Sequence, residues 1–255
     1  PYALTNAAKL SWDQLDGALV ATEYGAGTGG PFFYRGDTPA NPANTWHLLG
    51  LTAPAAAPTL AAAAAGGSLT VAGVYYWRTR DRYKHGSSAA STVSAASAAI
   101  AAPNQQITVT IAIPGTPRSD YLGWTLERTK AGGSALGPFY FVADGTAGTY
   151  ADGNADADLS YRSDETLHAT PPKLNGIIAH KDRLFGWVGA VLYASQVLGD
   201  VEATGIANWP ALQAYPFGKD DGEAITSVVR QGERLIILKP SSWWALEGDD
   251  PDSFR

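Results

Sequence analysis

The sequence predicts an all-β protein, with a β-sandwich inserted in or next to an incomplete β-propeller. Its 255 residues include 28 glycines and 16 prolines, which favour frequent turns. Short runs rich in Val, Ile, Thr and aromatic residues recur between these turns, and stretches with the 3.6-residue period of a helix are few. Hydrophobic residues make up 45% of the chain, which is enough for one large core or two ordinary cores.

The segment 173–255 has the clearest strand pattern. Three short apolar runs, AITSVV (224–229), RLIIL (234–238) and WWALE (243–247), are separated by two tight turns and predict an antiparallel meander. Continuous apolar runs are typical of strands covered on both faces, as in a propeller blade. A blade takes about 40–45 residues and a ring about four to eight blades. Residues 173–255 therefore hold at most two blades, and we expect the chain to continue beyond them.

Residues 1–52 predict a β-rich N-terminal segment that is part of the propeller or of a platform. The runs GALVATEY (17–24), PFFYR (31–35) and WHLLGL (46–51) suggest strands joined by polar turns. The following residues, 53–67, are mostly Ala, Pro and Gly. Because such small side chains bury little apolar area, we predict that 53–67 is a linker.

Residues 68–160 predict a single β-sandwich. Its strands are expected near 69–83, 89–95, 106–113, 121–129, 138–143 and 147–151. Within 75–83, aromatic side chains are expected to face the core and the arginines to line the opposite face. Residues 161–172, which are polar and then proline-rich, are predicted to be the exit linker.

Composition restricts the partners. The chain has 18 Lys and Arg against 24 Asp and Glu, a net charge of -6, which argues against tight binding of duplex nucleic acid but is compatible with transient DNA passage. The absence of cysteine excludes disulfides, cysteine-based zinc sites and thiol nucleophiles. No stretch of about 18 uncharged apolar residues occurs, so no membrane span is expected. The start of the chain also lacks the basic-then-apolar pattern of a signal peptide.

Several segments follow one another in a recognisable order. They are GVYYWRTRDRYKHGSSAAS (73–91), WTLERTKAGG (124–133), PFYFVADG (138–145), TYADGNADADL (149–159), RLFGWVGAVLYAS (183–195) and the final WWALEGDDPDSF (243–254). This order resembles tailed-bacteriophage virion proteins that combine a fibronectin-III-like sandwich with a tail β-propeller, as in the nozzle proteins of short-tailed phages. The resemblance implies a sixfold homo-oligomeric ring around a DNA channel. It further implies a location in the virion tail and contacts with other tail proteins such as an adaptor or fibres.

Arg78, Arg80, Arg82 and Lys84 recur at every second residue, so on a strand they would form one positive line. Three interpretations remain open: a solvated face, a contact with an acidic patch on a neighbouring subunit, and nucleic-acid binding. The last needs aromatic platforms on the same face, and only Tyr76 offers one.

Asp152, Asn154, Asp156 and Asp158 have the alternate spacing of the first ligands in a calcium loop. Glycine is absent at the sixth position, Ala157, and glutamate at the twelfth, Ser163. The run is therefore either a weak calcium site or a polar turn at the end of a strand.

Tryptophans supply further candidates. Strand tryptophans are most often core or subunit contacts, but their faces can also stack on sugars. Adjacent Trp243 and Trp244 must point to opposite faces, so one of them meets a second layer. Subunit-interface candidates are Arg78, Arg80, Arg82, Trp209, Trp243 and Trp244, and the wider set for a sugar platform adds Trp12, Trp46 and Trp187.

Enzyme chemistry finds little support in the motifs. No Gly-x-Ser-x-Gly elbow, phosphate loop or His-Glu-x-x-His helix occurs, and no cofactor is expected. The densest carboxylates are Glu247, Asp249 and Asp250, which are read either as a glycosidase pair or as a solvated turn before Pro251. The isolated histidines, read as surface or turn residues, are His47, His85, His168 and His180.

The leading hypothesis from the sequence is a non-enzymatic, ring-forming nozzle or tube subunit of a phage tail. Two alternatives remain: a secreted carbohydrate-active β-propeller enzyme and a glycan-binding adhesion module.

Overall fold

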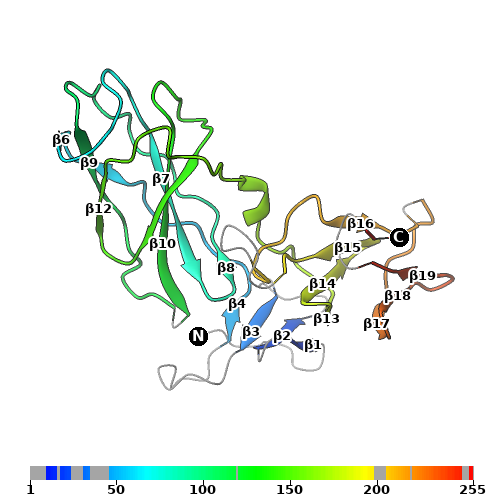
Figure 1. Cartoon of the computed structure of the whole chain (residues 1–255). Helices are drawn as coiled ribbons and strands as arrows, with labels where there is room; N and C mark the ends of the chain where they lie inside the picture. Colours follow the sequence, from blue (N-terminus) through cyan, green and yellow to red (C-terminus); the bar gives the residue numbers. More distant parts are fainter. Residues whose placement is uncertain are drawn as a thin grey trace. The chain divides into compact units, whose positions relative to one another are not determined.

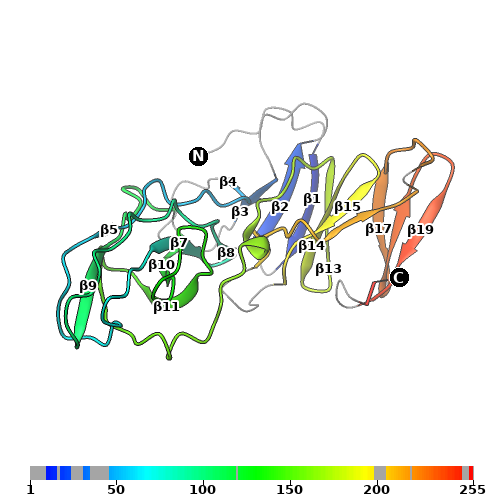
Figure 2. The same cartoon turned by 90° about the horizontal axis from the view of Figure 1, so that it is seen from above.

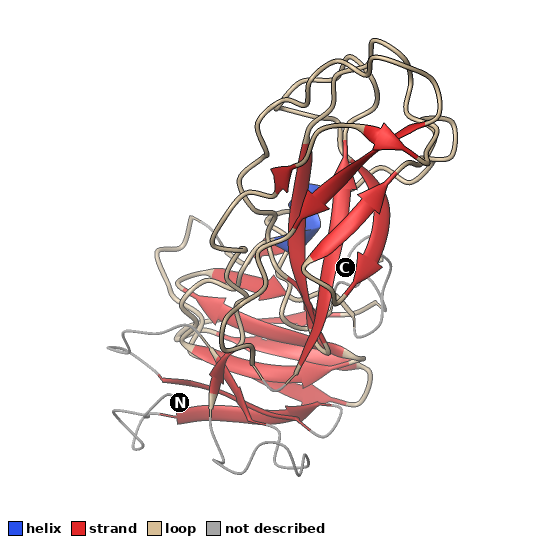
Figure 3. Ribbon diagram, turned by 90° about the vertical axis from the view of Figure 1, so that its left-hand side faces the viewer, coloured by secondary structure: helices blue, strands red, loops and turns tan. Residues whose placement is uncertain are grey.

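The computed structural model describes residues 10–15, 18–23, 31–34, 46–118, 120–197, 205–218, 220–248 and 253–254. The all-β prediction is confirmed, since the chain forms several antiparallel sheets (Figure 3). It divides into two compact units: Thr52–Glu165, which we call the sandwich unit, and Pro1–Leu51 with Thr166–Arg255, which we call the split unit. The sandwich unit thus interrupts the chain of the split unit.

The sandwich unit consists of two sheets. The first has the strand order β11-β10-β7-β8, and the second has the order β12-β9-β5, with β6 also pairing with β9. The strands are β5 (Thr59–Leu60), β6 (Ala64–Ala65), β7 (Trp77–Tyr83), β8 (Gly86–Ser87), β9 (Gln105–Thr110), β10 (Tyr121–Arg128), β11 (Tyr140–Gly145) and β12 (Thr149–Asp152).

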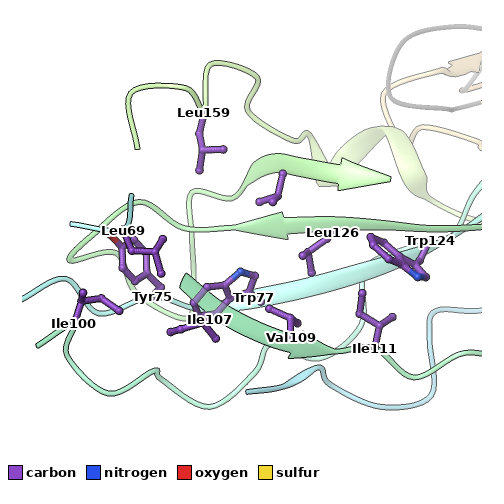
Figure 4. Packing of buried hydrophobic residues seen from close by; sticks show 11 residues of the cluster. Leu69, Tyr75, Trp77, Ile100, Ile107, Val109, Ile111, Trp124, Leu126 and Leu159 are labelled. Atoms are coloured by element: carbon purple, nitrogen blue, oxygen red, sulfur yellow. The ribbon is translucent and has the colours of Figure 1, made fainter. Parts of the chain in front are cut away.

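The two sheets enclose one hydrophobic core, shown in Figure 4. Trp77, Trp124 and Leu126 come from the first sheet, and Ile107 and Val109 come from the second. Each of these side chains is at most 2% exposed. Burial of such large apolar side chains supplies the main stabilisation of a sandwich, at about 1.5–3 kcal/mol each.

The predicted linker 53–67 is part of the sandwich unit instead. Its residues form β5 and β6, which both pair with β9. A Cβ on Gly67 would lie 2.5 Å from the carbonyl oxygen of Gln105 and 2.6 Å from the Cα of Gly153, so only glycine allows this close approach. Backbone pairing needs no large side chain, which is why the alanine-rich composition was misleading.

The predicted strand 89–95 is not a regular strand. Residues 88–97 follow β8 along the same side of β7. Every third residue of this segment is a serine, and these serines pair with every second residue of β7 and of the segment before it. The pairs are Ser88 with Asp81, Ser91 with Thr79, Ser94 with Trp77 and Ser97 with Tyr75.

Each serine replaces a missing backbone acceptor with its hydroxyl group. The N–H of Ser91 donates to the carbonyl of Thr79 at 2.8 Å, and the N–H of Thr79 donates to Ser91 Oγ at 3.0 Å. Ser91 Oγ in turn donates to the carbonyl of Thr92 at 2.8 Å. Two residues of a strand advance by roughly 6.6 Å, so three residues of this serine segment cover that distance in a less extended conformation.

The exit linker predicted at 161–172 is docked on the sandwich over its first residues. The N–H of Phe141 donates to the carbonyl of Tyr161 at 2.9 Å, and the N–H of Ser163 donates to the carbonyl of Phe139 at 3.0 Å. A 3-10 helix, η2 (Glu165–His168), follows. Residues 161–163 therefore extend the first sheet beyond β11.

The split unit contains three antiparallel sheets, each formed by consecutive strands (Figures 1 and 2). The first sheet holds β1 (Leu10–Leu15), β2 (Ala18–Glu23), β3 (Phe32–Tyr34) and β4 (His47–Leu48). The second holds β13 (Gly176–His180), β14 (Arg183–Val188), β15 (Val191–Ala194) and β16 (Ala214–Pro216). The third holds β17 (Ser227–Gln231), β18 (Arg234–Leu238) and β19 (Trp243–Leu246), as the meander pattern predicts.

The three sheets approach one another at their first strands, because β13 lies beside both β1 and β17. A core of Phe185, Leu192, Val228, Leu235 and Ile237 joins the second and third sheets. Small meander sheets that meet at their first strands are typical of propeller blades. The described residues nevertheless do not form a closed propeller.

Replacing one serine of the serine segment should destabilise the sandwich unit. We expect Ser91→Ala to lower the free energy of unfolding by about 1–3 kcal/mol, because the buried N–H of Thr79 loses its acceptor. Urea unfolding followed by tryptophan fluorescence measures this loss. Thr92→Ala, an exposed neighbour, is the control. Equal stability of the two variants would contradict the role of the hydroxyl group.

Candidate functional site

The predicted positive line on β7 is neutralised within the sandwich unit. The carboxylate of Glu127 on β10 accepts hydrogen bonds from the Nε atoms of both Arg78 and Arg80, the second at 2.7 Å. Glu165 lies 2.6 Å from Nη2 of Arg80. The side chain of Arg80 is only 1% exposed. Arg78 and Arg80, which the sequence offered as interface candidates, therefore have their charges paired with carboxylates of the same chain.

The electrostatics of this cluster favour ionised carboxylates. Burial works to raise the pKa of Glu127, but Arg80 and Arg78 outweigh it and hold that pKa below its ordinary value. Glu165 is less buried than Glu127. Burial also works to raise its pKa, but Arg80 and Arg78 again hold the pKa below its ordinary value. Arg82 has its own partner, Asp144, at 2.8 Å, and only Lys84 remains exposed. The cluster binds the exit segment at Glu165 to the sandwich, and offers no continuous cationic surface for nucleic acid.

The predicted calcium run holds an arginine. Asp152 is fully buried, and its Oδ2 lies 3.1 Å from Nε of Arg128 and 2.7 Å from Nε1 of Trp77. Asp156 Oδ1 lies 3.2 Å from Nη2 of Arg128, and the carbonyl of Asn154 accepts a hydrogen bond from the same nitrogen at 3.1 Å. Asp158 is exposed and does not join them.

The calcium prediction is therefore not supported, because the Arg128 guanidinium supplies the positive charge that these oxygens need. Arg128 is 0% exposed and also lies 4.5 Å above the ring of Tyr75. Burial raises the pKa of Asp152, opposed by Arg128 and by the Trp77 hydrogen bond. Among the described residues, no group of three or more His, Cys, Asp or Glu side chains could hold a metal ion.

Arg128→Gln should destabilise the sandwich unit strongly. The expected loss in the free energy of unfolding is about 3–5 kcal/mol, because Asp152 would be left as an unpaired buried charge. Arg234→Gln is the matched control, since Arg234 pairs with Glu247 at 2.7 Å while 55% exposed. A surface pair of this kind contributes about 0–1 kcal/mol. Equal losses in urea unfolding would contradict the buried-pair interpretation.

Asp81 on β7 is a carboxyl group that has no ion-pair partner among the described residues. It is 4% exposed, and burial raises its pKa to about 6, with the Tyr121 hydroxyl opposing the shift. The folded state therefore holds this proton more tightly than the unfolded state. Stability conferred by the neutral form is present below about pH 4 and is lost as the pH rises toward 6.

Asp81→Asn should remove this pH dependence. The difference between the ordinary pKa and about 6 corresponds to about 3 kcal/mol, so the variant should gain up to that amount relative to the parent between pH 4 and pH 7. Urea unfolding of both proteins across this range measures the difference, in which the contributions of all other groups cancel. A difference that is constant with pH would exclude a raised pKa at Asp81.

The tryptophan candidates separate into buried and exposed groups. Trp209, one of the interface candidates, is 3% exposed, and its Nε1 donates to the carbonyl of Ile206, so this side chain packs within the chain itself. Trp187 is also buried, at 6% exposure. Trp243 and Trp244 on β19 remain exposed, at 68% and 43%. Trp12 on β1 is 65% exposed, whereas Trp46 packs against the ring of Tyr34.

The other chemistry-bearing residues do not converge on one site. Glu247 pairs with Arg234, and Asp249 and Asp250 lie outside the described residues. His85 is buried but lies in the turn between β7 and β8, as predicted, whereas His168 is buried in η2 and is neither a surface nor a turn residue. His180 is partly buried, which lowers its pKa, and His47 packs against Phe33.

The third sheet exposes an apolar face. Leu235, Ile237 and Leu246 point to the core shared with the second sheet. Strand pairing places the alternate residues together on the opposite face, and Val229 and Trp243 among them are 42% and 68% exposed. The apolar residues of this outer face are Val229, Ile236, Leu238, Trp243 and Ala245, and the same register adds the polar residues Ser227, Gln231 and Arg234.

A cavity of about 750 Å³ lies where β1, β13 and β17 meet in the split unit. Among the described strands, each of these three pairs with a neighbour on one side only, so the cavity is bounded by three strand edges. Its lining includes Trp12, Asp13, Asn175, Trp187, Ser227 and Arg230.

Side chains satisfy the edge of β13 inside this cavity. Ser11 Oγ accepts from the N–H of Ile177 at 3.1 Å and donates to its carbonyl at 3.3 Å. Asp13 Oδ2 accepts from the N–H of Ala179 at 2.8 Å, and Arg230 Nη1 donates to the carbonyl of Ala179 at 3.1 Å. We call Ser11, Asp13 and Arg230 the edge clasp.

Sequence reasoning missed the edge clasp. Asp13 and Arg230 lie 3.3 Å apart in space but 217 positions apart in the chain. No local pattern marks either residue, because polar residues in short strands are common on solvated faces. Only the pairing of edge strands from both ends of the sequence could have identified them.

Comparisons with known proteins give no family assignment. No protein-family model matches the chain, and no curated protein matches it either. Within the described part of the chain, no helix has the length and apolar character needed to span a membrane.

Proposed function

We propose that this chain is a structural component of a tailed-phage virion, a ring-forming nozzle or tube subunit that surrounds the DNA exit channel. It acts by assembly and not by catalysis. The resemblance in segment order supports this proposal, and it carries the expectation of a hexameric ring that contacts an adaptor or fibres.

The uncovered outer face of the third sheet is the observation that carries the proposal. Ile236 and Leu238 on β18 and Trp243 on β19 are apolar at positions where an isolated antiparallel sheet would carry polar residues. Large apolar side chains on a free sheet face are typical of a surface that another protein layer covers. A head-to-tail contact through this face would build a ring when the rotation between subunits closes.

The electrostatics are compatible with a DNA channel. A net charge of -6 disfavours retention of a polyanion, since tight phosphate binding needs accessible Lys and Arg. In the sandwich unit, the arginines of β7 are paired with Glu127, Glu165 and Asp144. Passing DNA would therefore meet few unpaired cationic side chains on that strand.

The full-length protein should form rings whose stability depends on the outer face. Native mass spectrometry and negative-stain electron microscopy should show closed oligomers, and Trp243→Asp should weaken their assembly at least about tenfold. Leu136→Asp is the control, because Leu136 is 96% exposed on the other unit.

Two outcomes would contradict different parts of the proposal. A monomeric full-length protein, both alone and in virions, would exclude a ring-forming subunit. Rings that tolerate Trp243→Asp as well as Leu136→Asp would exclude the outer face as the subunit contact.

A further inference from the structure

The cavity between β1, β13 and β17 has the size of a small-ligand site. Its volume of about 750 Å³ falls within the range of about 300–1,000 Å³ that is usual for such sites. Ile178, Trp187 and Val228 form its buried apolar part, each less than 10% exposed. Asn175, Thr226 and Ser227 are polar lining residues that are partly or fully exposed. Apolar lining with a few polar groups is the usual composition of a binding site for organic molecules.

Trp12 is the largest accessible group in this cavity. Trp12 is one of the lining residues, and it is 65% exposed. Among the described residues, no aromatic ring or cation packs against the Trp12 indole. Exposing so much apolar area within a concave surface is unfavourable unless a ligand covers it. The flat face of an indole is suited to stack on a sugar ring or a base.

The charges in the cavity cancel. Asp13 and Arg230 form an ion pair, and both carboxylate oxygens of Asp13 also accept backbone hydrogen bonds. One nitrogen of Arg230, Nη1, donates a hydrogen bond to the carbonyl of Ala179. Neither a polyphosphate nor a cation therefore finds a net opposite charge here. A nucleic acid would also have to approach a chain whose net charge is -6.

Uncharged hydrogen-bonding groups remain available among the residues that line this cavity. The side chains of Asn175 and Ser227 form no hydrogen bonds with other described residues, whereas Thr226 Oγ1 already donates to the carbonyl of Leu238 at 2.9 Å. The amide of Asn175 can both donate and accept, and so can the hydroxyl of Ser227. Such groups match the hydroxyl groups of a neutral sugar.

We propose that this cavity binds a neutral saccharide, with one sugar ring stacked on Trp12 and its hydroxyl groups hydrogen-bonded by Asn175 and Ser227. The edge clasp holds the three strands around the cavity in place. This binding would be an activity separate from ring assembly.

Binding of neutral oligosaccharides to the full-length protein tests this proposal. The probes are cellopentaose, maltopentaose and N-acetylchitopentaose, each titrated into the millimolar range by calorimetry and by tryptophan fluorescence. At least one should bind saturably. Trp12→Ala should raise its Kd at least about tenfold, and Trp12→Phe should restore part of the affinity, because the ring still stacks. The matched control is Leu136→Ala, an exposed apolar residue of the sandwich unit that lines neither the cavity nor the outer face, and this change should leave the Kd unchanged.

The opposite results would overturn the proposal. These are no saturable binding of any probe, or binding that Trp12→Ala does not weaken. Urea unfolding of Trp12→Ala, whose altered side chain is exposed, verifies that the variant is folded. A short oligothymidylate is titrated in parallel, and Trp12-dependent binding of it in place of the sugars would assign the site to single-stranded nucleic acid instead.

Discussion

Backbone groups along the edges of small sheets need hydrogen-bond partners, and in this chain side chains supply them at several edges. Ser91 and the other serines of the serine segment give β7 a partner that is not itself a strand. Ser195 does the same for Leu184, whose N–H donates to Ser195 Oγ at 2.9 Å. The edge clasp satisfies β13 with a serine, an aspartate and an arginine. Because a buried unpaired backbone group costs about 1–3 kcal/mol, these contacts decide which small sheets can lie together.

The same principle explains why charged residues are found deep in the sandwich unit. Arg80 and Arg128 are almost fully buried, yet each lies among carboxylates from more than one part of the chain. Buried ion pairs add little net stability but strongly disfavour arrangements that separate them. They therefore specify how β7, β10 and the segments after β12 pack, while the aromatic core supplies the hydrophobic stabilisation.

Local patterns predicted the strands better than they predicted their partners. The meander of β17, β18 and β19 was evident, because apolar runs and turns identify strands within a few residues. The serine segment was misread as a strand, since its three-residue period has no counterpart in the two-residue alternation of a sheet. The carboxylates at Asp152 and Asp156 were interpreted as possible metal ligands because sequence spacing cannot show that Arg128 occupies the position between them. The cavity is lined by residues from distant parts of the sequence, so no local sequence pattern predicts it.

The division of the split unit has a consequence for synthesis on the ribosome. β1 emerges early, but its neighbour β13 follows only after the whole sandwich unit has been translated. At about 5–20 residues per second, this delay amounts to several seconds or more. The sandwich unit can fold during that pause, while β1 waits with an unpaired edge that is open to other nascent chains. Production of this protein is thus expected to be sensitive to translation rate and to chaperones that cover strand edges.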